Sequence, residues 1–228
     1  MTDTAAILEA ITSRRSVRAF RPDPVAAEVL DTILGAAARA PSGTNLQPWQ
    51  VIVLQGQALR ALGDELTDAF MAGDRGAREN EYYPLEWREP YIGRRRKVGW
   101  ALYDSLGITK GDGPAMQRQH ARNFRFFDAP VGLLFTMDRD MQIGSWLDLG
   151  MYMQNVMTAA RAFGLDTCAQ AAFADHHARI QRRLAIPAER QVICGMALGF
   201  AQTDAPENGF ATEREPLSSF ARFIDRLD

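Results

Sequence analysis

Three arginines and a serine fall within five residues near the start of the chain, in the string Arg14-Arg15-Ser16-Val17-Arg18-Ala19-Phe20. If the segment is extended, Arg14, Ser16 and Arg18 point to one face and Arg15 to the other, because successive side chains alternate. That face would present donors along a line, which suits an elongated phosphorylated ligand. A solvated basic cluster is the simpler interpretation of this string taken alone.

A second string, from Ala40 to Trp49, places small, hydroxyl and amide side chains in a loop bracketed by prolines: Pro41, Ser42, Gly43, Asn45, Gln47 and Pro48. Proline fixes the backbone, and glycine lets a ligand approach it closely. The amides of Asn45 and Gln47 can donate and accept, which suits the imide-like edge of a ring. A well hydrogen-bonded turn is the alternative interpretation.

No familiar nucleotide or nucleophile motif explains the sequence. The glycine-rich candidate, Gly111-Asp112-Gly113, has Met116 where a dinucleotide-binding fingerprint needs its third glycine. We find neither a phosphate-cradling loop that ends in Gly-Lys-Ser/Thr nor a Gly-x-Ser-x-Gly elbow. An enzyme with this sequence is therefore expected to take its reactive group from a cofactor.

The histidines and cysteines do not predict a metal site or a covalent nucleophile. His176 and His177 are adjacent, so on a helix they point about 100° apart and do not share a metal readily. A pair of Cys168 and His176 is conceivable, but Cys168 lies among apolar residues, as a core cysteine does. We expect no metal.

The segment from Arg78 to Lys97 differs from the rest of the chain, since ten of its twenty residues are charged. It also carries aromatic rings and no apolar periodicity: Tyr82, Tyr83, Trp87 and Tyr91. This composition fits either a lid that closes over a flat ligand or a solvated loop with packed tyrosines. We place the lid or insertion at about residues 73–125 of a single domain that spans residues 1–228.

Composition excludes several classes of protein. The 228 residues carry a formal net charge of -2, whereas a dedicated nucleic-acid binder needs a basic surplus. Only Lys97 and Lys110 are lysines, so nearly every cation is a planar arginine suited to phosphate or carboxylate. The two cysteines and the lack of a signal-peptide or membrane-span pattern predict a cytoplasmic protein.

Helical and strand patterns alternate loosely along the chain and predict an α+β or α/β fold with a mixed sheet. Helices are expected at residues 4–13, 57–71 and 145–163 and in the tail. Two more are expected from their N-caps: one begins after Asp23, with Pro24 in its first turn, and ends before Pro41, and the other runs from Asp175 to Leu184. Strands are expected at 49–54, 131–135, 166–172 and 191–201.

Taken together, the strings resemble the FMN-dependent nitroreductase family. The resemblance covers almost the whole chain and includes Arg14–Phe20, Pro41–Trp49, Gly164-Leu165 with Gln170-Ala171-Ala172, and Gly195-x-x-x-Gly199-Phe200 followed by Arg214. The sequence looks most like bacterial nitroaromatic reductases. The same superfamily contains iodotyrosine deiodinase, which shares the Arg-Arg-Ser-Val-Arg and Pro-Ser-Gly elements.

The resemblance implies an α+β fold with a mainly antiparallel sheet flanked by helices, in an intertwined homodimer with FMN at the subunit interface. The residues it implies for FMN are Arg14, Arg15, Ser16, Arg18, Pro41, Ser42, Gly43, Asn45, Gln47, Gln170, Ala171 and Arg214. Arg14, Ser16 and Arg214 would hold the phosphate and ribityl chain, with Arg15 adjoining. Arg18 would lie at the pyrimidine side, where a fixed cation stabilises reduced flavin.

The remaining implied residues divide between two subunits. Gln170 and Ala171 would lie near flavin N5, where many family members carry Glu-Gly. The loop from Pro41 to Asn45 would come from the partner subunit. Thr212 stands where a lysine is common, so phosphate neutralisation would depend more on arginines.

The implied activity is ping-pong, two-electron reduction of a nitroaromatic by NAD(P)H through nitroso to hydroxylamine. The lid residues Tyr82, Tyr83, Trp87, Tyr91 and Arg94, with Arg95 and Arg96, would enclose the acceptor and attract a carboxylate on it. Two alternatives stay open: a reductive dehalogenase of halophenols or halotyrosine, and a non-catalytic flavin-binding protein. No motif for the ribose 2′-phosphate distinguishes NADPH from NADH.

Overall fold

Four strands form one sheet in the computed structural model, which describes residues 3–226. They are β1 (Gln50–Gln55), β2 (Val131–Asp138), β3 (Asp166–Gln170) and β4 (Arg190–Gly199), in the order β1-β2-β4-β3. Every neighbouring pair of these strands is antiparallel. The expected α+β fold with a mainly antiparallel sheet is confirmed.

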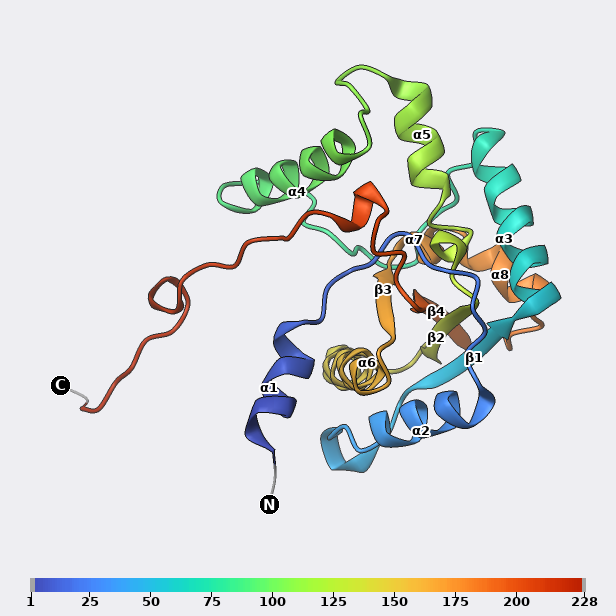
Figure 1. Cartoon of the computed structure of the whole chain (residues 1–228). Helices are drawn as coiled ribbons and strands as arrows, with labels where there is room; N and C mark the ends of the chain where they lie inside the picture. The colour runs from blue at the N-terminus through green and yellow to red at the C-terminus, as the bar shows by residue number, and fades with distance from the viewer. Residues whose placement is uncertain (1–2, 227–228) are drawn as a thin grey trace.

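Helices cover both faces of the sheet (Figure 1). One face packs against α2 (Ala27–Ala37) and α6 (Ile143–Ala162), and the other against α3 (Gly56–Met71), α7 (Ala172–Asp175) and α8 (His177–Arg183). Because side chains alternate along a strand, β2 contributes Leu133 and Phe135 to the first core and Leu134 to the second. Because helices cover both faces of the sheet, side chains on both sides of β2 are buried, which explains its continuous apolar sequence.

Three further helices lie outside these two layers. They are α1 (Thr4–Thr12), which packs against α6, α5 (Gly113–Ala121), which packs against α3, and α4 (Tyr91–Ser105), which lies beside the C-terminal segment (Figure 1). Neither α1 nor α4 buries a residue. The last part of the chain runs away from the body after passing α4. Within residues 3–226 no helix combines the length and apolar character that crossing a membrane requires.

Two predicted helix starts and one predicted helix are wrong. The second helix begins at Ala27 and not after Asp23, because Val25 is buried in the core and the chain stays extended through Ala26. The carboxylate of Asp23 pairs instead with Arg21. Asp175 ends α7 and pairs with Arg78, so α8 begins at His177. The tail carries a short 3-10 turn at Leu217–Ser219 in place of a helix.

The core between the sheet and helices α3, α7 and α8 contains a histidine, His176, whose protonation destabilises the folded state. His176 is 2% exposed, its ring lies edge-on to Phe124 at 4.8 Å, and neither ring nitrogen has a hydrogen-bond partner within residues 3–226. Burial lowers the pKa of His176 below its ordinary value of 6.5, and the nearby carboxylates of Asp74 and Asp175 oppose this while Arg179 adds to it.

We therefore expect stability to fall as the pH drops below about 6.5, because the unfolded chain then binds a proton that the folded His176 excludes. The free energy of urea unfolding, measured between about pH 7 and pH 5, should decline more steeply for the wild type than for His176→Leu. Parallel curves for the two proteins would show that this histidine is not the source of the pH dependence.

Candidate functional site

The arginine-rich string runs along the outer edge of β3. Ser16 forms a single parallel bridge with Thr167, and the backbone N–H of Val17 donates to the Thr167 carbonyl at 3.1 Å. Val17 and Ala19 are buried, whereas Ser16 is exposed and Arg18 half-buried. The segment is therefore extended, and its apolar side chains fix which face the polar ones present.

Arg14, Ser16 and Arg18 gather around one buried thiol. Burial raises the pKa of Cys168, and the hydroxyl of Ser16 together with the charges of Arg18 and Arg14 lowers it in part. The thiol of Cys168 thus stays protonated and does not act as a nucleophile. Arg15 points elsewhere, and its guanidinium donates to the Asn208 carbonyl at 2.7 Å.

Arg14 and Arg214, called here the cationic pair, lie close enough for the charge of Arg214 to affect the pKa of Arg14. Burial lowers the pKa of Arg14, and the neighbouring charge of Arg214 lowers it further. Neither guanidinium pairs with a carboxylate in the described part of the chain; that of Arg214 donates to the carbonyl and hydroxyl oxygens of Thr212 and to the Glu213 carbonyl, at 2.8–3.2 Å. Two close cations that lack an acidic partner are the donor set that a phosphate binds.

Gln170 and Ala171 lie where β3 ends and α7 begins. The side chain of Gln170 is 2% exposed, and its Nε2 donates to the Asn123 carbonyl at 2.7 Å. Its Oε1 has no hydrogen-bond partner within residues 3–226, so a buried acceptor is left for a ligand donor. Ala171 is half-buried beside it. No spacing in the sequence singled out Asn123, which orients this amide.

Gly195 determines how closely α7 packs onto the sheet at this point. It pairs with Gln170 in the sheet register, and a Cβ there would lie 2.7 Å from Cε2 of Phe173. The Phe173 ring is fully buried and stacks on Phe126 at 4.3 Å, so it cannot move aside.

We expect Gly195→Ala to destabilise the protein by about 1–3 kcal/mol and to lower Tm by roughly 2–12 °C, because overpacking is costly in a filled core. Gly35→Ala is the matched control, since nothing lies within 4 Å of a Cβ at that helical position. Thermal unfolding of both variants checks the expectation, and equal Tm values for them would contradict it.

Asn208 holds the arginine-rich segment in place, although no motif or spacing pointed to this residue. It is 3% exposed, its Oδ1 accepts from the Arg18 N–H at 2.8 Å, and its Nδ2 donates to the Ala19 and Gln202 carbonyls at 2.8 and 2.9 Å. The preceding residue, Glu207, is also buried and pairs with Arg122. One buried turn therefore fixes both the backbone and, through Arg15, a side chain of the string.

The loop at residues 41–47 adopts an unusual conformation. Thr44, Asn45 and Gln47 have φ values of 48°, 62° and 50°, in the left-handed region that non-glycine residues rarely occupy. The N–H of Gly43 donates to both carboxylate oxygens of the buried Asp148 at 3.2 and 3.3 Å.

The same loop is tied internally and not to the arginines. The N–H of Gln47 donates to the Ser42 hydroxyl at 3.0 Å, and the Gln47 amide to the Asn45 carbonyl at 3.3 Å. Within residues 3–226 its hydrogen bonds do not reach the string at residues 14–18. Pro41 is exposed, as are Gly43, Asn45 and Gln47. One subunit thus does not bring together the two halves of the expected FMN set.

The aromatic residues of the predicted lid form a cluster. The rings of Tyr82 and Tyr83 are 4.8 Å apart, those of Tyr83 and Trp87 are 5.4 Å apart, and the Arg95 guanidinium lies 4.6 Å from the Trp87 centroid. Tyr91 begins α4 and contacts other arginines. The segment from Arg78 to Lys97 is thus part irregular cluster and part helix.

Arg94 carries an ion pair that the sequence did not predict. Its Nε lies 3.0 Å from Glu215, and Nζ of Lys97 lies 2.6 Å from Glu213. These two glutamates flank Arg214 in the sequence. The first turns of α4 are therefore joined to the segment that carries one arginine of the cationic pair.

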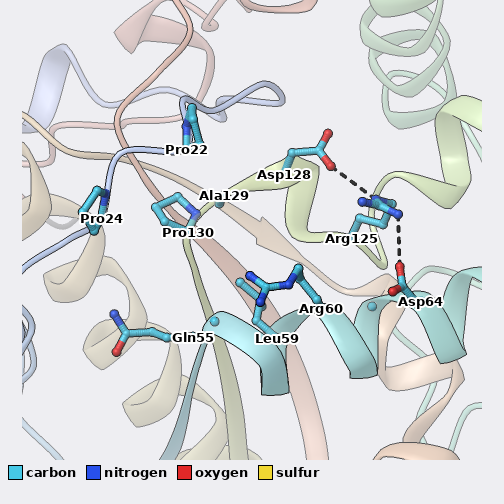
Figure 2. A pocket seen from close by; sticks show the side chains of 12 residues that line it. Pro22, Pro24, Gln55, Leu59, Arg60, Asp64, Arg125, Asp128, Ala129 and Pro130 are labelled. Atoms are coloured by element: carbon cyan, nitrogen blue, oxygen red, sulfur yellow. Dashed lines mark hydrogen bonds and ion pairs between the residues drawn. The ribbon is translucent and has the colours of Figure 1, made fainter.

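A separate hollow of about 570 Å³ lies at the start of α3 (Figure 2). Three prolines and Leu59 form much of its wall, and Arg125 pairs there with Asp64 and Asp128. None of the expected FMN residues lines this hollow. It is therefore distinct from the candidate site.

Comparisons with known proteins agree with the sequence resemblance. Residues 11–200 match the model of the nitroreductase family. The chain is 39% identical to "4-nitrobenzoate reductase" of Nocardioides sp. (strain LMS-CY), over 94% of this chain and 88% of that protein. It is 38% identical to "Nitrobenzene nitroreductase" of Ectopseudomonas oleovorans, over 94% of this chain and 95% of that protein.

Solved structures show the same similarity. An FMN and NADPH-dependent nitroreductase NfnB from Sphigopyxis sp. strain HMH superposes with a TM-score of 0.93 at 36% identity, over 96% of this chain and 99% of that one. The FMN-dependent nitroreductase NfnB from Mycobacterium smegmatis in complex with NADPH gives 0.92 at 31% identity, over 96% and 98%. This chain belongs to the nitroreductase family.

Proposed function

We propose that this protein is an FMN-dependent NADPH oxidoreductase that reduces nitroaromatic compounds. The observation that carries the proposal is the pair of Arg14 and Arg214, two close cations that no carboxylate neutralises within the described residues. The family membership supports it, as do relatives named for FMN and NADPH dependence and for nitrobenzene and 4-nitrobenzoate reduction.

The donor set fits FMN along its whole length. Arg14, Ser16 and Arg214 would hold the phosphate and ribityl chain, with Arg15 adjoining. Arg18 would contact the pyrimidine side, and Gln170 with Ala171 the N5 edge, where the unpartnered Oε1 of Gln170 supports a ligand contact. When bound, FMN would supply the hydride chemistry between NADPH and the nitro group.

The residues of the chain would bind FMN, orient it and enclose the site. Arg14 and Arg214 would hold the phosphate end of FMN and so restrict its orientation in the site. The extended backbone at residues 16–20, anchored by Asn208, keeps Arg18 in a fixed place and supplies a charge that needs no reorganisation. The protonated Cys168 contributes packing and no covalent step.

The preferred acceptor is proposed to be a nitroaromatic compound that carries a carboxylate. The lid residues Tyr82, Tyr83, Trp87 and Tyr91 supply flat apolar surface, and Arg94 supplies a cation that a carboxylate could share with Glu215. The relative named for 4-nitrobenzoate supports this choice.

A homodimer is proposed to complete the site, with the loop at residues 41–47 serving the partner's flavin. Large apolar side chains lie exposed on α1, on α6 and in the tail: Ile7, Leu8, Ile11, Ile143, Leu147, Phe220, Phe223 and Ile224. Such a surface is characteristic of an interface. The tail extends away from the body (Figure 1), and we propose that it wraps around the second copy of the chain.

An acceptor screen tests the proposal. FMN-loaded protein with NADPH should convert 4-nitrobenzoate and nitrobenzene to hydroxylamines, and light scattering should give twice the 25.4 kDa chain mass. Release of halide from halophenols with no nitro reduction would favour the dehalogenase instead. A monomer that turns over at the full rate would contradict the shared site.

A further inference from the structure

A cavity of about 830 Å³ lies between α4 and the segment at residues 210–216. Arg94, Lys97 and Ala101 line it from one face of the helix, because residues three and four apart project to the same side. Arg214 lines it from the opposite segment. Figure 1 shows this segment passing beside α4 before the tail leaves the body.

Arg214 connects this cavity to the proposed flavin site without merging the two. Its charge acts on Arg14, which places it beside the proposed FMN phosphate. Neither Arg14 nor Ser16 lines the cavity in the described part of the chain. The cavity therefore shares one residue, Arg214, with the proposed phosphate end of the flavin site.

Arg94 and Lys97 of α4 form solvent-exposed ion pairs with two glutamates. Side chains in the Arg94–Glu215 pair are 49% and 46% exposed, and those in the Lys97–Glu213 pair are 67% and 74% exposed. Exposed ion pairs contribute little net free energy, so a more highly charged anion can replace the carboxylates. A phosphomonoester carries nearly two charges and accepts a bidentate guanidinium contact.

We propose that this cavity binds the ribose 2′-phosphate of NADPH, with Arg94 and Lys97 as its ligands in exchange for Glu215 and Glu213. The inference rests on the proposed function, which takes NADPH as the reductant, and names the residues that would select it over NADH. NADH lacks this phosphate and would leave both native ion pairs in place. Arg94 and Lys97 would then select NADPH over NADH.

The test uses the FMN-loaded protein and two probes that differ in the 2′-phosphate, adenosine 2′,5′-bisphosphate and 5′-AMP. Calorimetry should show tighter binding of the bisphosphate to the wild type. Arg94→Gln and Lys97→Gln should each weaken bisphosphate binding roughly tenfold or more and leave 5′-AMP unchanged. Arg96→Gln is the matched control, because this exposed neighbour does not line the cavity.

Three results would overturn the proposal. Equal affinities of the wild type for the two probes would show that no 2′-phosphate site exists. A rise in the FMN dissociation constant of the two variants, with an unchanged preference between probes, would assign Arg94 and Lys97 to the flavin. Loss of 4-nitrobenzoate binding with unchanged binding of the bisphosphate would assign them to the acceptor carboxylate only. A holoenzyme that neither NADPH nor NADH reduces would instead refute the proposed function, which keeps the two failures distinct.

Discussion

Replacing Arg14 by glutamine is expected to raise the dissociation constant of FMN roughly 10- to 100-fold. Arg14 is half-buried, the charge of Arg214 acts on it, and neither arginine forms an ion pair with a carboxylate in the described structure. A charge-assisted hydrogen bond to phosphate contributes about 1.5–3 kcal/mol, and removing the arginine forfeits it. Quenching of FMN fluorescence during titration of the apoprotein measures the change.

Arg214→Gln should give a loss of similar size, whereas the exposed Arg96→Gln on α4 should bind FMN as the wild type does. Riboflavin, which lacks the phosphate, should bind the wild type and Arg14→Gln with nearly the same affinity. Equal weakening of FMN and riboflavin by Arg14→Gln would contradict a phosphate contact and indicate a general disturbance of the fold.

Asn208→Ala is expected to lower the free energy of unfolding by about 2–4 kcal/mol and to weaken FMN binding at the same time. The change removes one acceptor and two donors that serve buried backbone groups of Arg18, Ala19 and Gln202. Unpaired buried polar groups keep their full desolvation cost. Urea unfolding followed by circular dichroism measures the first effect and fluorescence titration the second.

Asn208→Asp provides the control, because the carboxylate keeps the acceptor for Arg18 and loses the two donors. It should lie between the wild type and Asn208→Ala in FMN affinity. An alanine variant that loses stability but binds FMN with wild-type affinity would show that Asn208 supports the fold alone and does not position the arginine string.

Much of the fold was predictable because its core elements carry simple periodic signals. The continuous apolar run of β2 and the long α6 were placed within two or three residues. The errors occurred where tertiary contacts overrode local signals. Asp23 and Asp175 have the side chains of helix caps, yet both carboxylates pair with arginines, and the helices begin elsewhere.

The candidate site was predictable only where side-chain type carried the information. The string at residues 14–18 stood out because guanidinium groups are rarely so concentrated, and the structure gathers Arg14, Ser16 and Arg18 around Cys168. Asn123 and Asn208 could not be found in this way, because their importance lies in long-range hydrogen bonds to backbone groups. The pairing of α4 with the segment around Arg214 likewise joins residues more than a hundred positions apart.

The most direct test of the account is an anaerobic spectroscopic titration of the FMN-loaded protein with NADPH. We expect one equivalent of NADPH for each bound flavin to bleach the visible flavin band, and later addition of 4-nitrobenzoate to restore it. Protein that stays colourless after incubation with FMN, or a bound flavin whose band NADPH leaves unchanged, would contradict the proposed function.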